Sequence, residues 1–77
     1  MIKSIFIERL HRLLDSIDMS FDSQERANEF ARLFKIPVST SRAILAGIMP
    51  PSDALLDQIT KELEVTREWL LGKEKNN

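Results

Sequence analysis

Apolar side chains recur at helical spacing through the first part of the chain. One stripe carries Ile2, Ile5, Phe6, Leu10, Leu13, Leu14 and Ile17. Lys3, Arg9 and Arg12 fall outside this stripe. An apolar stripe with polar residues on the remaining face is typical of an amphipathic helix packed against a core. The pattern predicts a first helix over residues 2–17.

A second helix is predicted over residues 23–34, after a break rich in residues that cap helices. Asp22 followed by Glu25 fits a capping box, and Phe21 stands where a hydrophobic staple would lie. The apolar face of this helix would bury Ala27, Phe30, Ala31 and Phe34. Ile36-Pro37 ends the helix, because a residue before proline avoids the α conformation.

A third, short helix is predicted over residues 40–46. Ser39 and Thr40 are candidate caps for its start, and Gly47 stands where a glycine commonly ends a helix. Together with the preceding helix and the tight turn at Ile36-Pro37, it has the spacing of a helix-turn-helix.

Two further helices follow. Ser52 or Asp53 would cap a helix that runs through Leu63, and Thr66 would cap a short helix over residues 67–71. No segment has the alternating pattern of a strand. We therefore expect an all-α fold, a compact five-helix bundle with a central helix-turn-helix, in one domain over residues 1–72 with a polar tail over residues 73–77.

Composition agrees with a small globular domain. The chain has 77 residues, of which 43% are hydrophobic and 30% charged. It has no Cys and one His, His11, so neither a disulfide framework nor a metal site is expected. His11 has no nucleophile or second base beside it, and we expect no enzyme and no cofactor. No signal peptide or membrane-spanning run is present, which favours a soluble cytoplasmic protein.

The charge of the chain favours no partner as a whole. Its formal net charge is −1, with seven Lys/Arg against six Asp/Glu up to Gly47 and four against six thereafter. A DNA-binding surface would therefore have to be a local patch, because the basic signature of a whole DNA-binding domain is missing.

The middle of the chain resembles the lambda-repressor-like family of helix-turn-helix regulators, which includes Cro-type and XRE proteins. The resemblance runs through Phe30-Ala31-Arg32-Leu33-Phe34-Lys35-Ile36-Pro37-Val38-Ser39-Thr40-Ser41-Arg42-Ala43-Ile44-Leu45-Ala46-Gly47. It continues through Pro51-Ser52, Leu56, Ile59, Leu63 and Val65, and closes with Glu68-Trp69-Leu70-Leu71-Gly72. The similar region covers about residues 27–72.

Three positions depart from the family pattern. Lys35 stands where the turn usually has Gly, so we expect a left-handed and strained backbone there. Ser41 replaces a buried Val or Ile, which should weaken the packing of the recognition helix. Ala27 aligns with the usual Gln, whereas Ser23-Gln24 lies about one turn earlier, so the phosphate-contacting end of the second helix should be displaced.

The resemblance implies that the third helix enters the major groove of DNA and reads base edges. The residues expected to read bases are Val38, Ser39, Thr40, Arg42, Ala43 and Ala46. Among them Arg42 is the strong reader, because a guanidinium can bind guanine O6 and N7 bidentately, although it could instead contact phosphate. The residues expected to contact phosphates are Ser23, Gln24, Arg26, Lys35, Arg9 and Arg12.

The expected function is sequence-specific transcriptional regulation of the phage or prophage repressor type. We expect a homodimer on a two-fold operator, with Glu68, Trp69 and Leu70 at the dimer surface, although a core anchor is the favoured interpretation of Trp69. The alternative is a protein-interaction module, such as an antitoxin or antirepressor, that keeps the fold. The expected partners are thus double-stranded DNA, a second copy of the chain, or a toxin-like protein.

Overall fold

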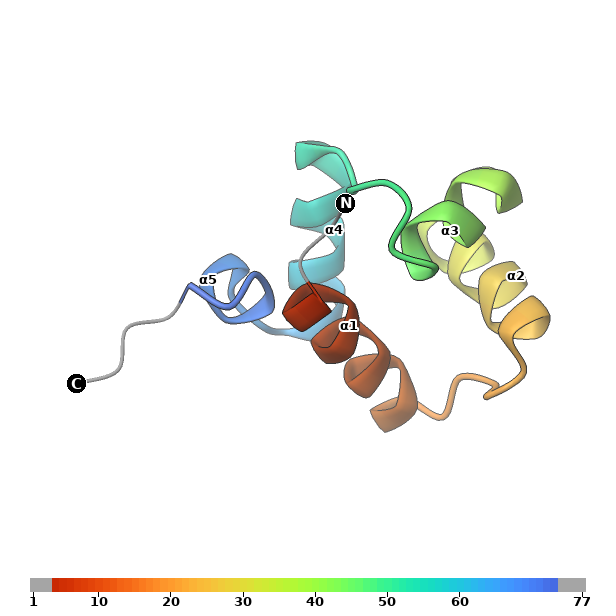
Figure 1. The fold of residues 1–77 in the computed structure, drawn as a ribbon, viewed down its shortest axis with the longest axis horizontal. Helices are drawn as coiled ribbons and strands as arrows, with labels where there is room; N and C mark the ends of the chain where they lie inside the picture. The colour runs from red at the N-terminus through yellow and green to blue at the C-terminus, as the bar shows by residue number, and fades with distance from the viewer. Residues whose placement is uncertain (1–3, 74–77) are drawn as a thin grey trace.

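The computed structural model describes residues 4–73, which form five α-helices and no strand (Figure 1). The predicted all-α fold is confirmed, as is the number of helices. Residues 2 and 3, which the sequence places in the first helix, and residues 74–77 of the predicted tail lie outside the described residues. The helices are α1 (Ser4–Ser16), α2 (Ser23–Phe34), α3 (Val38–Leu45), α4 (Asp53–Leu63) and α5 (Arg67–Leu70).

The helices pack around one core. In Figure 1, α2 and α3 lie together on one side of the molecule and α5 lies on the opposite side, with α1 and α4 between them. α2 packs on α3 and α4, while α5 packs on both α1 and α4. Every helix contributes buried side chains to this core, among them Phe6, Leu10, Phe30, Ile44, Ile59 and Leu70.

Three predicted caps are confirmed. The Asp22 carboxylate accepts a hydrogen bond from the Glu25 N–H at 3.0 Å. The Ser52 hydroxyl, rather than Asp53, accepts from the Leu55 N–H at 3.2 Å at the start of α4. Thr66 caps α5 in the same way. Each cap satisfies an N–H group that has no partner within its own helix.

The first, third and fifth helices each end one residue earlier than predicted, and the start of the third is wrong by more. α3 begins at Val38, two residues earlier than expected, because Pro37 has the extended backbone of an N-cap residue and leaves Ser39 and Thr40 inside the helix. Proline suits the start of a helix, where its missing N–H costs nothing. α1 ends at Ser16, and Ile17 is exposed rather than buried.

Lys35 is left-handed, as predicted, with φ 58° and ψ 47°. The N–H of the next residue, Ile36, then donates to the Ala31 carbonyl at 3.0 Å, the reversed hydrogen bond of a Schellman motif. α4 ends in the same way, with Glu64 at φ 57° and ψ 47° and a bond of 3.1 Å from the Val65 N–H to the Thr60 carbonyl.

The first and last of the described helices meet directly. Gly72 has a positive φ of 73°, and a Cβ atom there would lie 2.7 Å from Cγ2 of Ile5. Only glycine combines this backbone with so close an approach. None of the helices within residues 4–73 is long and apolar enough to cross a membrane.

Candidate nucleic-acid interface

The inner face of α3 is fixed against α2. Ser41 and Ile44 are fully buried, and the Ser41 hydroxyl donates to the Ala27 carbonyl at 2.7 Å. Ser41, which the sequence predicts to weaken this packing, thus adds a hydrogen bond between the two helices that an aliphatic side chain could not make. A serine opposite an alanine also lets the two backbones come close together.

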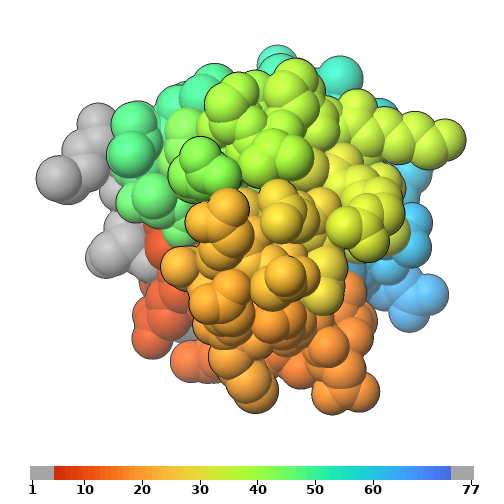
Figure 2. Space-filling view, turned by 90° about the vertical axis from the view of Figure 1, so that its right-hand side faces the viewer, coloured from red at the N-terminus to blue at the C-terminus, as the bar shows by residue number. Residues whose placement is uncertain are grey.

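The outer face of α3 lies on the surface that Figure 2 presents, which is formed mainly by α2 and α3. Of the six predicted base readers, four are exposed and two, Thr40 and Ala43, are half-buried. The exposed members are Val38, Ser39, Arg42 and Ala46. One long cationic side chain is thus surrounded by small or apolar ones, and such a helix surface can approach another molecule closely.

The charge along this part of the chain differs from that of the rest. Between Glu29 and Asp53 the sequence has three cations and no acid, whereas the remainder has eight Lys/Arg against twelve Asp/Glu. The three cations, Arg32, Lys35 and Arg42, are all exposed. The net charge of −1 therefore hides a local positive stretch that runs from the second half of α2 through α3.

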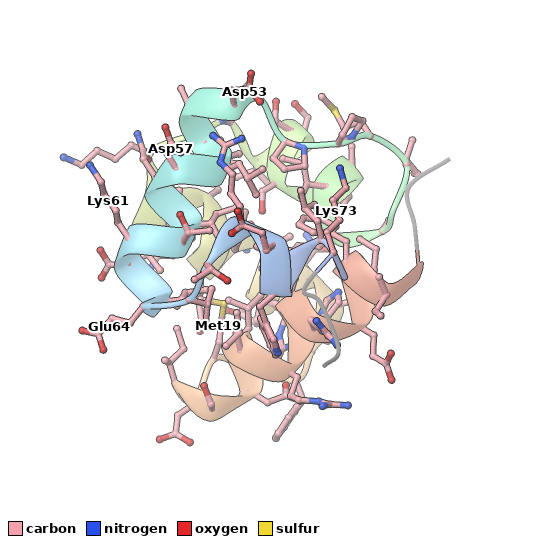
Figure 3. The ribbon with its side chains drawn as sticks, turned by 90° about the vertical axis from the view of Figure 1, so that its left-hand side faces the viewer. Met19, Asp53, Asp57, Lys61, Glu64 and Lys73 are labelled. Atoms are coloured by element: carbon pink, nitrogen blue, oxygen red, sulfur yellow. The ribbon has the colours of Figure 1, made fainter. Side chains whose placement is uncertain are left out.

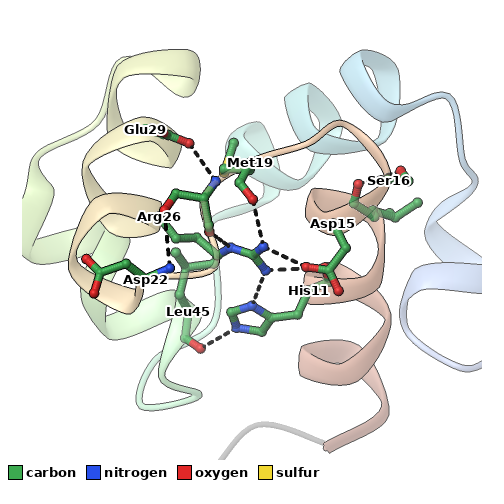
Figure 4. A network of polar contacts seen from close by, with 10 residues as sticks. His11, Asp15, Ser16, Met19, Asp22, Arg26, Glu29 and Leu45 are labelled. Atoms are coloured by element: carbon green, nitrogen blue, oxygen red, sulfur yellow. Dashed lines mark hydrogen bonds and ion pairs between the residues drawn. The ribbon is translucent and has the colours of Figure 1, made fainter.

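Arg26 does not lie where a phosphate contact would need it. Its side chain is buried, with 5% of the residue exposed, and its guanidinium is fully engaged inside the protein (Figure 4). Nη2 donates to the Asp15 carboxylate at 2.6 Å and to the Met19 carbonyl at 3.1 Å, and Nε donates to the Ser20 carbonyl at 2.7 Å. The prediction that Arg26 contacts phosphate is therefore wrong, because its guanidinium is not available to a ligand.

His11 connects this arginine to the end of α3. Nη1 of Arg26 lies 3.0 Å from Nδ1 of His11, and Nε2 of His11 lies 2.9 Å from the Leu45 carbonyl oxygen (Figure 4). A guanidinium only donates hydrogen bonds, so Nδ1 must accept and Nε2–H must donate. The imidazole is thus the neutral Nε2–H tautomer, and it holds the last turn of α3 against α1.

Sequence reasoning missed this network. Arg26 precedes Phe30 by four residues and Phe34 by eight, so it lies at the edge of the buried stripe of α2. That register was the available signal for its burial. Its location in the first turn of α2, however, is also where a phosphate-binding arginine would stand, and the residues that neutralise it come from another helix.

The first turn of α2 exposes Ser23 and Gln24. Both line an open groove of about 270 Å³, which Arg42 and Ala46 also line from α3. The structure therefore brings two predicted phosphate contacts and two predicted base readers around one concave surface.

The remaining predicted phosphate contacts are spread over the molecule. Lys35 is exposed at the turn between α2 and α3. Arg12 is exposed on α1, where it pairs with Glu8 at 3.7 Å. Arg9 lies against α5: its guanidinium carbon is 4.7 Å from the centroid of the Trp69 ring, and it also donates to the Trp69 carbonyl. Arg9 is therefore not brought together with α3.

The predicted dimer surface needs one correction. Leu70 is fully buried in the core and cannot contact a second copy of this structure. Glu68 is exposed, and Trp69 is half-buried between Arg9 and the core. The favoured interpretation of Trp69, an anchor for the last helix, agrees with this packing.

On the opposite side of the molecule, one arginine is paired with two acids of α4. Figure 3 shows Asp53 and Asp57 along α4, and the Arg67 guanidinium reaches Asp57 at 2.6 Å and Asp53 at 3.5 Å. The hydrogen bond and the charge of Arg67 lower the pKa of Asp57, while the hydrogen bond to Asp57 raises the pKa of Arg67. Within residues 4–73, Arg42 has no such ion-pair partner.

No three His, Asp or Glu side chains in residues 4–73 are grouped so that they could hold a metal ion. No family model, no curated protein and no solved structure matches the chain. Any functional conclusion therefore has to come from the geometry of α2 and α3.

Proposed function

We propose that this protein is a sequence-specific DNA-binding transcriptional regulator, similar to lambda-repressor-like proteins, with α3 as its recognition helix. One observation carries the proposal. α3 is fixed by its inner face and presents Arg42, which has no ion-pair partner within residues 4–73. This arginine stands among small side chains, within a stretch that has cations and no acid. A surface of this kind suits a polyanion whose bases must be approached closely.

The dimensions agree with this role. An α-helix with its side chains is about 10–12 Å in diameter, and the major groove of B-DNA is about 12 Å wide. Arg42 would bind guanine through O6 and N7. Ser39 and Thr40 would donate to or accept from base edges, while Val38, Ala43 and Ala46 would meet thymine methyl groups.

Phosphate contacts would come from both ends of α2. Ser23 and Gln24 stand in its first turn, where N–H groups and the helix dipole favour an anion, and Lys35 follows its last turn. Such contacts fix the position of the protein on DNA without reading the sequence. Because Lys35 is the only cation among these three residues, the dependence of affinity on salt should be shallow.

We also propose that the protein binds DNA as a homodimer. A single interface with one strong base reader would bind weakly, and two copies on a two-fold operator would double the contacts. The exposed Glu68 and the accessible part of Trp69 remain the proposed dimer contacts.

A selection from random DNA tests this function. We expect an enriched sequence that contains guanine, and a loss of about tenfold to a hundredfold in affinity for it with Arg42→Ala. Lys61→Ala, which removes one cation from the exposed surface of α4, is the charge-matched control and should bind as the wild type does. An absence of enrichment, or equal affinities for the two variants, would contradict the proposal.

A second candidate function is a protein-interaction module, such as an antitoxin. It is favoured by the apolar residues that directly follow α3, where Ile48 is 74% exposed and Met49 is also exposed. In that case random DNA yields no enriched sequence. The product of a neighbouring gene would instead co-purify with this chain, and Ile48→Ser would weaken that association.

A further inference from the structure

The groove beside α3 is walled by three helices. Its base is formed by Ala27 and Leu45, both buried, together with the imidazole of His11. Its edges are formed by Ser23 and Gln24 from α2 and by Arg42 and Ala46 from α3. The groove has a volume of about 270 Å³, which is close to the smallest volume of small-molecule pockets, about 300 Å³.

The base of the groove offers contact surface and few free hydrogen-bonding groups. His11 uses one ring nitrogen toward Arg26 and the other toward the Leu45 carbonyl. Arg26 also lines the groove, but its charge is balanced by Asp15 at 2.6 Å. A ligand that lies on this base therefore meets methyl groups and the edge of a ring, which favour an apolar body.

The edge of the groove has the opposite character. No carboxylate is among the lining residues, and Arg42 has no ion-pair partner within residues 4–73. The Ser23 hydroxyl and the Gln24 amide belong to the same edge and add neutral hydrogen-bonding groups. An arginine without a partner, above an apolar base and without an acid nearby, favours an anionic head group, and a carboxylate matches the planar fork of a guanidinium.

The geometry points to a binding site for a small monocarboxylate with an apolar body. The carboxylate binds the Arg42 guanidinium, and the apolar body lies over Ala27 and Leu45. Another groove, between α2 and α4, does not combine these elements, because it is lined by both Lys61 and Glu62.

Such a ligand would regulate the proposed function, and this step depends on that function. A guanidinium held by a carboxylate cannot at the same time bind guanine O6 and N7. Occupancy of the groove therefore lowers the affinity for the selected DNA. The ligand is an inhibitor of DNA binding that competes for a single side chain.

The test uses sodium benzoate as the probe and the full chain labelled with ¹⁵N. We expect saturable shifts of the backbone amide signals of Ser23, Gln24 and Ala46, with sodium chloride at equal ionic strength as the baseline. Benzamide has nearly the same shape but no charge, and it should bind about tenfold more weakly or worse, as expected when a charge-assisted hydrogen bond is lost. Shifts that do not saturate, or that benzamide reproduces, would overturn the inference.

Two variants locate the probe. Arg42→Ala should weaken benzoate binding about tenfold, whereas Lys61→Ala should leave it unchanged. Ala46→Leu keeps the charge of Arg42 but fills the edge of the groove, and it should abolish binding. Binding that survives Ala46→Leu, or that falls equally with Lys61→Ala, would place the probe elsewhere and overturn the inference.

A final measurement separates this inference from the proposed function. Benzoate should lower the affinity of the wild type for the selected DNA, as measured by fluorescence anisotropy. If the chain binds benzoate in the groove but selects no DNA, the site stands and the DNA-binding proposal fails. If it selects DNA but shows no saturable benzoate binding, the site fails and the DNA-binding proposal stands.

Discussion

The chain makes the same helix-turn-helix connection twice, and the two copies have different uses. α2 and α4 both end in a left-handed residue, Lys35 or Glu64, with nearly equal φ and ψ. In each copy the next residue is β-branched and donates back to the helix, and a single N-cap residue then starts the following helix. The local backbone therefore does not explain why α3 presents a surface and α5 does not.

The difference arises at the fourth residue after the N-cap. This position is Ser41 in α3 and Leu70 in α5, and both residues are fully buried. Ser41 is small and hydrogen-bonded to α2, so α3 is held closely along its inner face, while Val38, Ser39 and Arg42 stay exposed on its other face. Leu70 fills core volume, and its four-residue helix mainly closes the bundle.

The network around Arg26 should show the largest effect, because only the first of the two connections depends on a buried charge. Arg26→Met leaves Asp15 and the acceptor nitrogen of His11 without their donor, and we expect a loss of about 3–5 kcal/mol in the free energy of unfolding. Urea denaturation measures this loss. Arg67→Met, in the exposed ion pairs of the second connection, should be much milder, and equal losses would contradict the contrast.

The two equivalent buried positions should respond differently to truncation. Leu70→Ala opens a cavity in the core, and we expect a loss of about 2–5 kcal/mol in unfolding free energy. Ser41→Ala removes one hydrogen bond and almost no volume, so about 1 kcal/mol should be lost. Thermal denaturation of the two variants provides the comparison, and a larger loss at Ser41 would mean that α3 is held by more than its inner face.

The two left-handed residues should respond alike. Lys35→Gly and Glu64→Gly each relieve the strain of a side chain at positive φ but also make the unfolded chain more flexible. We expect each to stabilise the fold by about 0.5 kcal/mol. Denaturation midpoints measured side by side test this equality. If only one of the two variants were more stable, the side chain removed in the other variant would have made stabilising contacts.

The smallest effect should be found at the exposed pair of Asp57 and Arg67. Its hydrogen bond lowers the pKa of Asp57 below the ordinary value of 3.8, so its contribution to stability is present above that pH. The contribution disappears as the pH falls through the lowered pKa and Asp57 takes up a proton. Melting temperatures of the wild type and Asp57→Asn should therefore differ slightly at neutral pH and converge in acid; a gap that stays constant would refute this.

Much of the fold follows from local signals. Apolar stripes locate the first two helices, and capping and turn residues locate the other three. The caps Asp22, Ser52 and Thr66 were recognisable because their side chains bond N–H groups only three residues away. The left-handed Lys35 could be predicted from the resemblance, because Lys35 stands where the turn of that family usually has glycine. Such features depend on neighbours in sequence, which a single chain displays.

The errors concern residues whose role depends on distant partners. Arg26 looks like a surface cation until α1 supplies Asp15 and His11 from 11 and 15 residues away. Ser41 looks like a defect until the Ala27 carbonyl lies opposite it, and Leu70 looks available until α5 turns it into the core. The candidate interface itself could be outlined from sequence, but the groove beside Arg42 needs three helices in place.

The close contact between Ile5 and Gly72 has a consequence for synthesis on the ribosome. α1 is made first among the described helices and α5 last, yet they pack on each other, with Arg9 beside Trp69. Part of the apolar face of α1 therefore stays uncovered until residue 72 has left the exit tunnel of the ribosome. Completion of this fold depends on the arrival of α5, and until then the emerging chain exposes the part of α1 that α5 covers.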